Sequence, residues 1–358
     1  MTAMAGLAPD RDAGLRPVPW RRMVWVTWRQ HRFALAGLAA LYGVAAISLV
    51  AGGMQMRDAH AAVTLCRRPA GSPGCQQLAA HFLNTYVPAA LGTLSWLQLL
   101  PAVVGMFVGA PLLARELETG TFRYAWTQGF GRTRLVVAKF AMLGVPVTVV
   151  AGAFSILISW YIQPLTNHVG DSPALDVVNP AVFDLLGVVF AAWTLMAFAI
   201  GAFAGAVVRR AAPAMVATLA VWAGLLLATG GVLRQRYLAP MTAQITNPNG
   251  VPSQRIHGLV LEFEWARGGK PVPLSRLNEV LRPVHVRATG AFDFEPTEYR
   301  PPPVDPFSYL MHRGYVLQAV YLPDDRFWTY QWIEAGWLLA LSFLLLAATV
   351  WLVRRRAA

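Results

Sequence analysis

The residues of this sequence best suited to chemistry lie in a short charged stretch between two long apolar runs. The stretch is RELETGTFRYAWTQGFGRTRLVVAK, residues 115–139, with five basic residues, two carboxylates and an adjacent Gly-Thr pair. Its GFG has a G-x-G skeleton, but no strand precedes it, so we interpret it as a turn and not as a nucleotide loop. The sequence also lacks G-x-x-x-x-G-K-S/T, so we expect this chain not to hydrolyse ATP by itself.

Other candidate residues give no catalytic pattern. His257, His285 and His312 do not have the spacing of metal ligands. Glu262 and Glu264 lie two apart on an apparent strand, where one solvated strand face explains them better than a hydrolase pair. We therefore expect no enzyme active site, no metal and no cofactor in this chain.

The composition is that of a membrane protein. Of the 358 residues, 56% are hydrophobic and 13% are charged, and the mean hydropathy is +0.45. Runs of about 20 residues without internal charge are each long enough to cross a hydrocarbon layer of about 30 Å as a helix. There are six: 33–53, 94–114, 140–161, 183–208, 211–233 and 332–353. The predicted fold class is an all-α bundle of six transmembrane helices with a small α+β extracytoplasmic segment before the last helix.

The spans lack ionisable residues near their middles, which argues against a proton- or ion-coupled carrier. Asp184 and Glu334 lie only at the outer ends of the fourth and sixth runs. Basic residues concentrate on one side: the N-terminus, 115–139, the Arg209-Arg210 corner and the tail hold 16 of the 30 Lys and Arg but four of the 18 Asp and Glu. The positive-inside rule makes this side cytoplasmic, so both termini are expected on the cytoplasmic side of the plasma membrane. Orientation and anionic lipid headgroups thus explain the basic pI, and we expect no nucleic-acid partner.

The remaining segments suggest a simple division of the chain. Residues 1–18 have a disordered composition, residues 33–233 hold five spans, residues 234–331 are extracytoplasmic and packed on the spans, and 332–358 form the last span with a basic tail. Residues 19–32 predict an interfacial amphipathic helix, with a basic aromatic flank to the first span as the alternative. The residues that define it are Trp20, Arg21, Arg22, Trp28 and Arg29.

The two cysteines, Cys66 and Cys75, flank a Pro- and Gly-rich loop on the side assigned as outside. Such a loop closes easily into a disulfide in an oxidising compartment. Two free thiols are the alternative, and they would count against the orientation.

The charged stretch itself reads as a hairpin at the cytoplasmic surface. Glu116 and Glu118 end the second span, and Gly120-Thr121 can break the chain and start a short helix. The aromatic residues after it, Tyr124 and Trp126 among them, could dock into a groove of a soluble partner. Plain anchoring of two spans is equally compatible with these residues.

This stretch resembles the first cytoplasmic loop of permease subunits of type-2 ABC exporters, particularly the actinobacterial group. There an acidic pair, a Gly-Thr and a later Arg and Lys enclose the coupling helix. YLPDDRFWTYQWIEAG, residues 321–336, resembles the start of the last span in the same group. The resemblance implies two permease copies and two separately encoded ABC ATPase subunits, which bind ATP and Mg. It assigns the coupling loop to Glu116, Glu118, Gly120, Thr121, Arg132 and Lys139, with Tyr124 and Trp126 as docking aromatics.

Two residue-level hypotheses follow. We expect Glu116 or Glu118 to pair with an arginine of the interfacial helix, Arg21, Arg22 or Arg29. An interfacial aromatic belt is the preferred explanation of Trp328, and an outer gate formed by Trp328 and Glu334 is the alternative.

An amphiphilic or hydrophobic substrate fits the uncharged spans, and membrane lipids are expected partners. The alternative function is a membrane-anchored sensor or assembly factor that acts through residues 234–331.

Overall fold

The computed structural model describes residues 20–66, 73–119, 132–166, 168–169, 172–173, 175, 177–245, 258–297 and 304–355. Within these ranges six helical segments are long and apolar enough to cross a membrane. They are His31–Cys66, Gly74–Glu118, Val136–Thr166, Gly187–Val208, Ala211–Arg236 and Asp324–Arg355. The predicted fold class is therefore confirmed.

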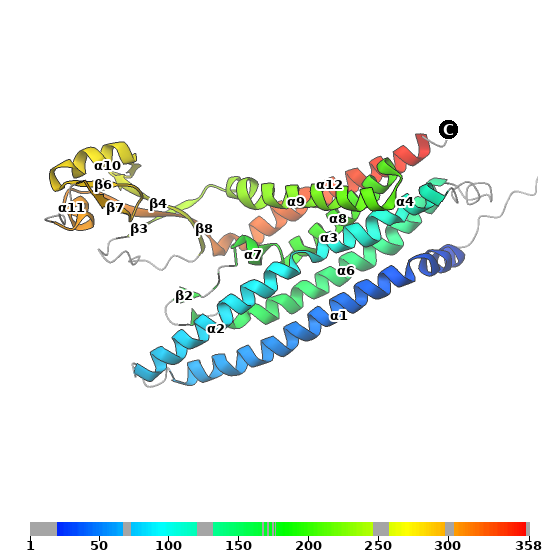
Figure 1. Ribbon diagram of the computed structural model, residues 1–358, viewed down its shortest axis with the longest axis horizontal. Coiled ribbons are helices and arrows are strands. Elements are labelled where there is room, and N and C mark those ends of the chain that lie inside the picture. The colour runs from blue at the N-terminus through cyan, green and yellow to red at the C-terminus, as the bar shows by residue number, and fades with distance from the viewer. Residues whose placement is uncertain are drawn as a thin grey trace, which may run out of the picture.

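The helices form one elongated bundle with a strand-containing module at one end (Figure 1). The helical elements are α1 (Trp20–Cys66), α2 (Pro73–Leu97), α3 (Leu100–Val104), η1 (Gly105–Gly109, a π-helix), α4 (Ala110–Thr119), α6 (Arg132–Thr166), α7 (Pro180–Phe183), α8 (Gly187–Val208), α9 (Ala211–Ala228), η2 (Thr229–Leu233, a π-helix), η3 (Arg234–Arg236) and α12 (Phe327–Arg355). We call the end with Arg115, Arg209, Arg210 and Arg354 the basic end, and the opposite end the sheet end. The N-terminal end of α1 and the C-terminal end of α12 both lie at the basic end (Figure 1).

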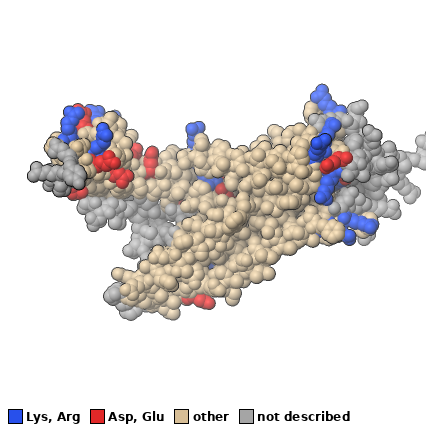
Figure 2. All heavy atoms as spheres, viewed as in Figure 1, with Lys and Arg blue, Asp and Glu red and all other residues tan. Residues whose placement is uncertain are grey.

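Charged groups are distributed accordingly on the surface. Figure 2 shows Lys and Arg gathered at the basic end, mixed charges on the module, and a largely uncharged surface between them. This is the distribution that a protein crossing an apolar layer requires, because a charged side chain facing lipid is costly.

The first helix is much longer than its apolar run. With 47 residues, α1 extends for about 70 Å, roughly twice the hydrocarbon thickness of a bilayer. Residues 20–32 are its first turns, so the expected interfacial helix is continuous with the first span. At the other end α1 and α2 continue beyond the predicted spans as a helical hairpin, so residues 54–66 and 73–93, between the first two predicted spans, are helical.

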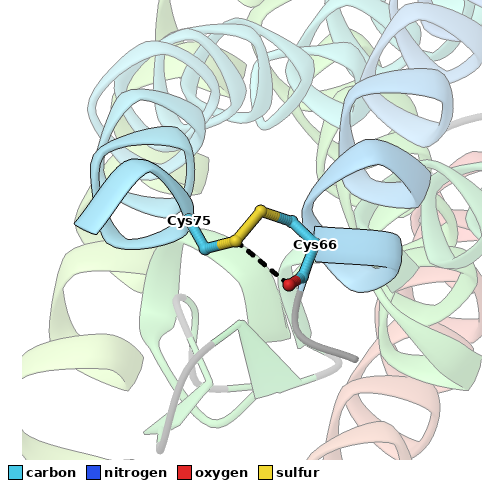
Figure 3. The surroundings of a disulfide bond; sticks show 2 residues. All are labelled: Cys66 and Cys75. Atoms are coloured by element: carbon cyan, nitrogen blue, oxygen red, sulfur yellow. Dashed lines mark hydrogen bonds between the residues drawn. A yellow bond between two sulfur atoms is a disulfide. The ribbon is translucent and has the colours of Figure 1, made fainter. Parts of the chain in front are cut away.

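A disulfide and an arginine contact help to hold this hairpin. The Cys66–Cys75 disulfide joins the end of α1 to the first turns of α2 (Figure 3), with 5.6 Å between the Cα atoms. Arg57 reaches across to the end of α6, where its Nη2 donates to the carbonyl oxygen of Trp160 at 2.6 Å and to Gln163 Oε1 at 3.0 Å. The hairpin is therefore a supported extension of the bundle.

The second span is broken near Pro101 and Pro111, whereas Pro88 lies inside α2 without a break. The chain leaves α2 at Leu97, resumes as α3 just before Pro101, and passes through the π-helix η1 before Pro111. Proline lacks a backbone donor and clashes with the preceding turn, so such breaks are the usual result. Gln98, in the first break, donates its Nε2 to the carbonyl oxygen of Pro180 in α7 at 3.1 Å.

Helix α8 occupies the centre of the bundle and is mostly buried. It packs against the broken span through two G-x-x-x-G pairs, Gly105 with Gly109 and Gly201 with Gly205. A Cβ atom on Gly201 would collide with the carbonyl oxygen of Gly105, and one on Gly205 with that of Ala110. Small residues permit such backbone contact between membrane helices.

The module after α9 has its own core. Its main sheet is antiparallel with strand order β3 (Met241–Ile245), β8 (Val316–Pro323), β4 (Gly258–Arg267) and β5 (Lys270–Pro271). The remaining elements are α10 (Leu274–Leu281), η4 (Arg282–Val284), the strand pair β6 (Val286–Ala288) and β7 (Phe294–Pro296), and α11 (Pro306–His312). Two short strands, β1 (His168–Val169) and β2 (Ser172–Pro173), pair between α6 and α7.

One part of this module combines a helix with a strand. In SYLMHRGYVLQAVY, residues 308–321, α11 ends at His312, and β8, the strand that leads into α12, begins at Val316. Leu259 and Leu322, at the base of the sheet, belong to the same apolar cluster as Tyr330 of α12. The module is therefore packed on the bundle at its base.

The glycine contacts give a first prediction. Gly201→Ala should lower the free energy of unfolding by about 1–3 kcal/mol, because the added methyl group must push α8 away from η1. Gly224→Ala is the matched control, since a Cβ there meets nothing within 4 Å. The thermal unfolding midpoint of the detergent-purified protein measures both changes, and equal midpoints would contradict the close-contact argument.

Candidate functional site

The charged stretch is closed at its two ends by an ion pair. Lys139 lies in α6 with only 2% of its surface exposed, and its ammonium contacts Glu116 Oε1 of α4. A buried ammonium needs a partner because the cost of taking it out of water is otherwise not recovered. The pair therefore fixes α4 to α6 on either side of residues 120–131.

Glu118 makes a different connection. Its Oε2 accepts a hydrogen bond from the backbone N–H of Ala211 at 3.2 Å, at the first residue of α9. The residue preceding α9, Arg210, makes no side-chain cap of its own. A carboxylate at a helix N-terminus satisfies a free donor and interacts favourably with the helix dipole. Glu118 thus joins α4 to α9.

These partners differ from the arginine pairing expected from the sequence. Glu116 and Glu118 contact α6 and α9, whereas the guanidinium of Arg29 lies over the Trp25 ring at 5.4 Å. Trp28 and Arg29 are exposed on the first turns of α1. Nothing in the sequence of residues 115–139 indicated that the partner of Glu116 would be Lys139 and not an arginine of α1.

Several predicted residues fall outside the described part of the chain. Four of them belong to the undescribed residues between α4 and α6: Gly120, Thr121, Tyr124 and Trp126. Their roles stay predictions. For four further residues the structure describes the backbone, which is helical, but not the side chain: Trp20, Arg21, Arg22 and Arg132.

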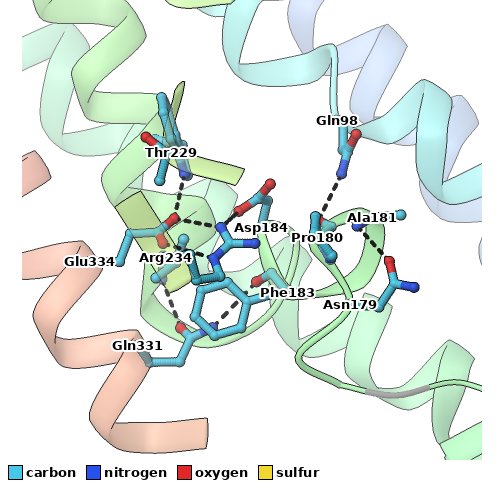
Figure 4. Close-up of polar contacts among 12 residues, drawn as sticks. Gln98, Asn179, Pro180, Ala181, Phe183, Asp184, Thr229, Arg234, Gln331 and Glu334 are labelled. Carbon is cyan, nitrogen blue, oxygen red and sulfur yellow. Dashed lines mark hydrogen bonds and ion pairs between the residues drawn. The ribbon is translucent and has the colours of Figure 1, made fainter. Parts of the chain in front are cut away.

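At the sheet end, three charged residues form a buried group that we call the ion triad: Asp184, Arg234 and Glu334. Figure 4 shows the Arg234 guanidinium between the two carboxylates. Its Nε donates to Glu334 Oε2 at 3.1 Å and its Nη2 to Glu334 Oε1 at 2.9 Å, and Nη2 also contacts Asp184 Oδ1. The triad joins the turn between α7 and α8, the η3 segment that follows α9 and η2, and the first turns of α12.

Aromatic and amide groups surround the triad. The Arg234 guanidinium lies 4.2 Å from the centre of the Phe183 ring, and Trp193 Nε1 donates to Glu334 Oε1 at 3.2 Å. One turn before Glu334, Gln331 accepts from the Val189 N–H at 3.1 Å and donates to the Phe183 carbonyl at 3.3 Å. Hydrogen bonding of this kind is what makes a buried charge group tolerable.

Local structure brings these residues inward. Asn179 caps α7 by accepting from the Ala181 N–H at 3.0 Å, which places Asp184 at the next turn. The π-helix η2 ends α9 immediately before Arg234. A π turn adds a residue to the helical repeat and changes the direction of the side chains that follow.

The triad has one cation for two acids, so its charge is not balanced when both carboxylates are ionised. Burial raises the pKa of the Asp184 carboxyl to about 7, with Arg234 acting in the opposite direction and Glu334 adding to the rise. Asp184 is therefore the member best able to hold a proton near neutral pH.

The structure also bears on the outer-gate hypothesis. Glu334 is completely buried beside Arg234, while Trp328 is 58% exposed at the start of α12. The two side chains do not line a shared opening. Trp328 and Trp332, both largely exposed near the sheet end, fit the interfacial aromatic belt better.

The sequence analysis did not identify Arg234 as a site residue, because it assigned Arg234 to the extracytoplasmic segment 234–331. Two observations could have identified it: it follows directly on an apolar run, and acids stand at the outer ends of two other spans. The G-x-x-x-G pairs GMFVG and GAFAG were also visible in the sequence and were missed.

Six membrane-crossing helices, with charged groups held at the two ends and small-residue packing between them, define a multi-pass helical membrane protein. The chain belongs to the ABC-2 membrane transporter related family, whose model matches residues 37–234, more than half of the chain. The match runs from α1 to Arg234. Comparison with curated proteins and with solved structures gave no match. The family is a membrane-transport component of ABC systems, as the resemblance predicted.

The triad gives a second prediction. Arg234→Leu should cost about 3–5 kcal/mol of stability, because it leaves two buried carboxylates without their cation. Arg236→Leu, two residues further on and exposed, should change stability by less than about 0.5 kcal/mol. Unfolding of the detergent-purified variants tests this, and a similar cost for both substitutions would show that the triad does not stabilise the fold.

The raised pKa of Asp184 gives a third prediction. Between its usual pKa of 3.8 and its folded value of about 7, the folded state holds more protons than the unfolded state, so stability falls as pH rises through this range. Asp184→Asn should remove this part of the slope, since an amide does not titrate. Thermal unfolding at several pH values compares the two proteins, and an unchanged slope in the variant would assign the titration elsewhere.

Proposed function

We propose that this chain is the permease subunit of a type-2 ABC exporter of the actinobacterial group, driven by a separately encoded ABC ATPase that binds ATP and Mg. The family match supports the class of protein. The observation that supports the mechanism is the Glu116–Lys139 ion pair, which ties α4 to α6 on either side of residues 120–131. A loop held in this way can pass a displacement into the bundle instead of absorbing it.

In this proposal the basic end is cytoplasmic, and the protein lies in the plasma membrane with both termini inside. The gathering of Lys and Arg at this end supports the orientation (Figure 2). The Cys66–Cys75 disulfide is near the opposite end, where an oxidising compartment would preserve it.

The contacts suggest a route for the motion. The ATPase dimer closes on ATP and moves the 120–131 loop, and α4, α6 and α9 follow together because Glu116 and Glu118 join them. The glycine contacts pass the motion from α4 and η1 to α8. Two permease copies and two ATPase subunits then rock as rigid bundles to open a path outward for an amphiphilic or hydrophobic substrate.

A charge swap tests this proposal and is the fourth prediction. In a complex reconstituted with the partner ABC ATPase, Glu116→Lys or Lys139→Glu alone should lower the ATPase activity at least severalfold, because each leaves like charges in contact. The double exchange should restore much of it. Arg354→Glu, at the same end but outside the loop, is the control.

Co-purification provides a separate readout of docking. Replacing Tyr124 and Trp126 with alanine should abolish binding of the ATPase while leaving the permease folded. If the wild-type chain binds no ATPase, the proposal fails, and the separately folded module favours the sensor or assembly-factor function.

A further inference from the structure

We propose that the ion triad is a proton-controlled latch between two parts of the protein. One part is the α7 segment, which we define as residues 180–186 and which includes Asp184. The other part is the base of the module, where Arg234 precedes the module and Glu334 follows it in the chain. A proton bound at Asp184 holds the two parts together, and loss of this proton releases the α7 segment.

Arg234 and Glu334 form the permanent side of the latch. The guanidinium binds both carboxylate oxygens of Glu334, and Trp193 donates a third hydrogen bond to Oε1. A carboxylate with three donors is favoured in its charged form. Arg234 lies before β3 and Glu334 after β8, and these two strands pair. This ion pair therefore joins the two connections between the module and the bundle.

Asp184 has the weaker position in the triad. Its Oδ1 contacts Arg234 Nη2, a nitrogen that also donates to Glu334. The remaining guanidinium nitrogen, Nη1, is buried and has no hydrogen-bond partner within the described part of the chain. Arg234 thus gives Asp184 no nitrogen of its own. Because both acids are buried and share one cation, the proton that balances the charge belongs on Asp184.

The charged groups that face Asp184 come from two elements packed against it, Arg234 of η3 and Glu334 of α12. Tyr237, which follows η3, interacts with the same two charges as a neutral hydroxyl. From α6, the uncharged Ser155 donates to the Gly187 carbonyl at 2.9 Å. At the base of the module, the charges of η5 act on Tyr330: Asp325 and Arg326. Burial, Arg234 and Glu334 therefore determine when Asp184 loses its proton.

The direction of the pH effect follows from the two states of Asp184. Burial raises its pKa to about 7 in the closed latch, and a released, hydrated carboxyl returns toward its usual value of 3.8. Between these values the closed latch holds more protons than the released one. Each unit of pH increase in this range favours release about tenfold, and no further change is expected above pH 7. The latch is therefore closed by acid.

Local structure allows the α7 segment to move separately from α8. Gly187, the first residue of α8, has a φ of +56°, a conformation that other residues rarely adopt. The segment also holds its own amides, since the N–H groups of Val182 and Phe183 donate to the Asn179 carbonyl. It can shift as a unit about Gly187 while α8 stays packed in the bundle.

The α7 segment is connected to the broken second span. Gln98, in the first break of this span, donates to the Pro180 carbonyl at 3.1 Å. Release of the segment therefore frees the sheet end of the span whose basic end holds Glu116 and Glu118. In transport, the proton would set how easily the sheet end opens when the ATPase moves the loop. Only this effect on transport rests on the proposed function.

The experiment is amide hydrogen exchange of the full-length protein in nanodiscs, measured by mass spectrometry between pH 5 and pH 8 and corrected for intrinsic exchange rates. Protection of residues 182–186 should fall about tenfold per pH unit up to pH 7 and then stay constant. Protection of residues 338–345, in the middle of α12, should not change with it. This comparison separates release of the latch from unfolding of the bundle.

Three variants assign the effect to the triad. Asp184→Asn should keep residues 182–186 protected at every pH, because an amide has no proton to lose. Glu334→Gln leaves Arg234 with one acid, so Asp184 stays ionised and paired, and the pH dependence between pH 5 and pH 7 should again disappear. Asp325→Asn, which changes an exposed acid at the same end, is the control and should keep the wild-type profile.

The effect on transport has its own readout. In proteoliposomes with the partner ABC ATPase and ATP at the basic end, acidification at the sheet end from pH 7.5 to pH 5.5 should lower ATPase activity severalfold. Asp184→Asn should give the low activity at both pH values, because its latch stays closed. Equal wild-type activity at both pH values would remove the role of the latch in transport.

Exchange that does not depend on pH in the wild-type protein, or a pH dependence that survives Asp184→Asn, would overturn the latch. A parallel loss of protection in residues 338–345 would overturn it as well, because it would show unfolding of the bundle. The exchange experiment needs no ATPase, so its failure is distinguishable from failure of the proposed function. A pH-dependent α7 segment in a chain that binds no ATPase would keep the latch and remove the exporter.

Discussion

The backbone contact between α8 and the broken second span is the constraint on which the rest of the bundle depends. In lipid there is no hydrophobic force to bring helices together, so close packing must supply the attraction. Gly201 and Gly205 let α8 approach Gly105 and Ala110 at backbone distance. With α8 in this central position, α6, α9 and α12 pack around it, and the turn that precedes α8 holds Asp184 of the ion triad.

Ion pairs join the ends of the helices that pack together through small residues. At the basic end Glu116 joins α4 to α6, and at the sheet end Arg234 of η3 joins the segment after α9 to α12 and to the turn between α7 and α8. Both groups lie where the helices leave the apolar layer, so the charges are kept out of its centre. Helices fixed to one another at both ends are suited to move as rigid units, which a transporter driven by a separate subunit requires.

The sequence by itself determined the fold class, the number and approximate places of the spans, and the cysteine pair, because apolar length and short spacing are local properties. It did not determine that residues 54–66 continue α1, since a helix that leaves the bilayer loses its apolar signal, or that 316–321 form a strand. The tertiary structure alone decided the ion partners. Arg234 meets acids 50 and 100 residues away, and Glu116 meets Lys139 instead of α1, because such pairs depend on which helices pack together.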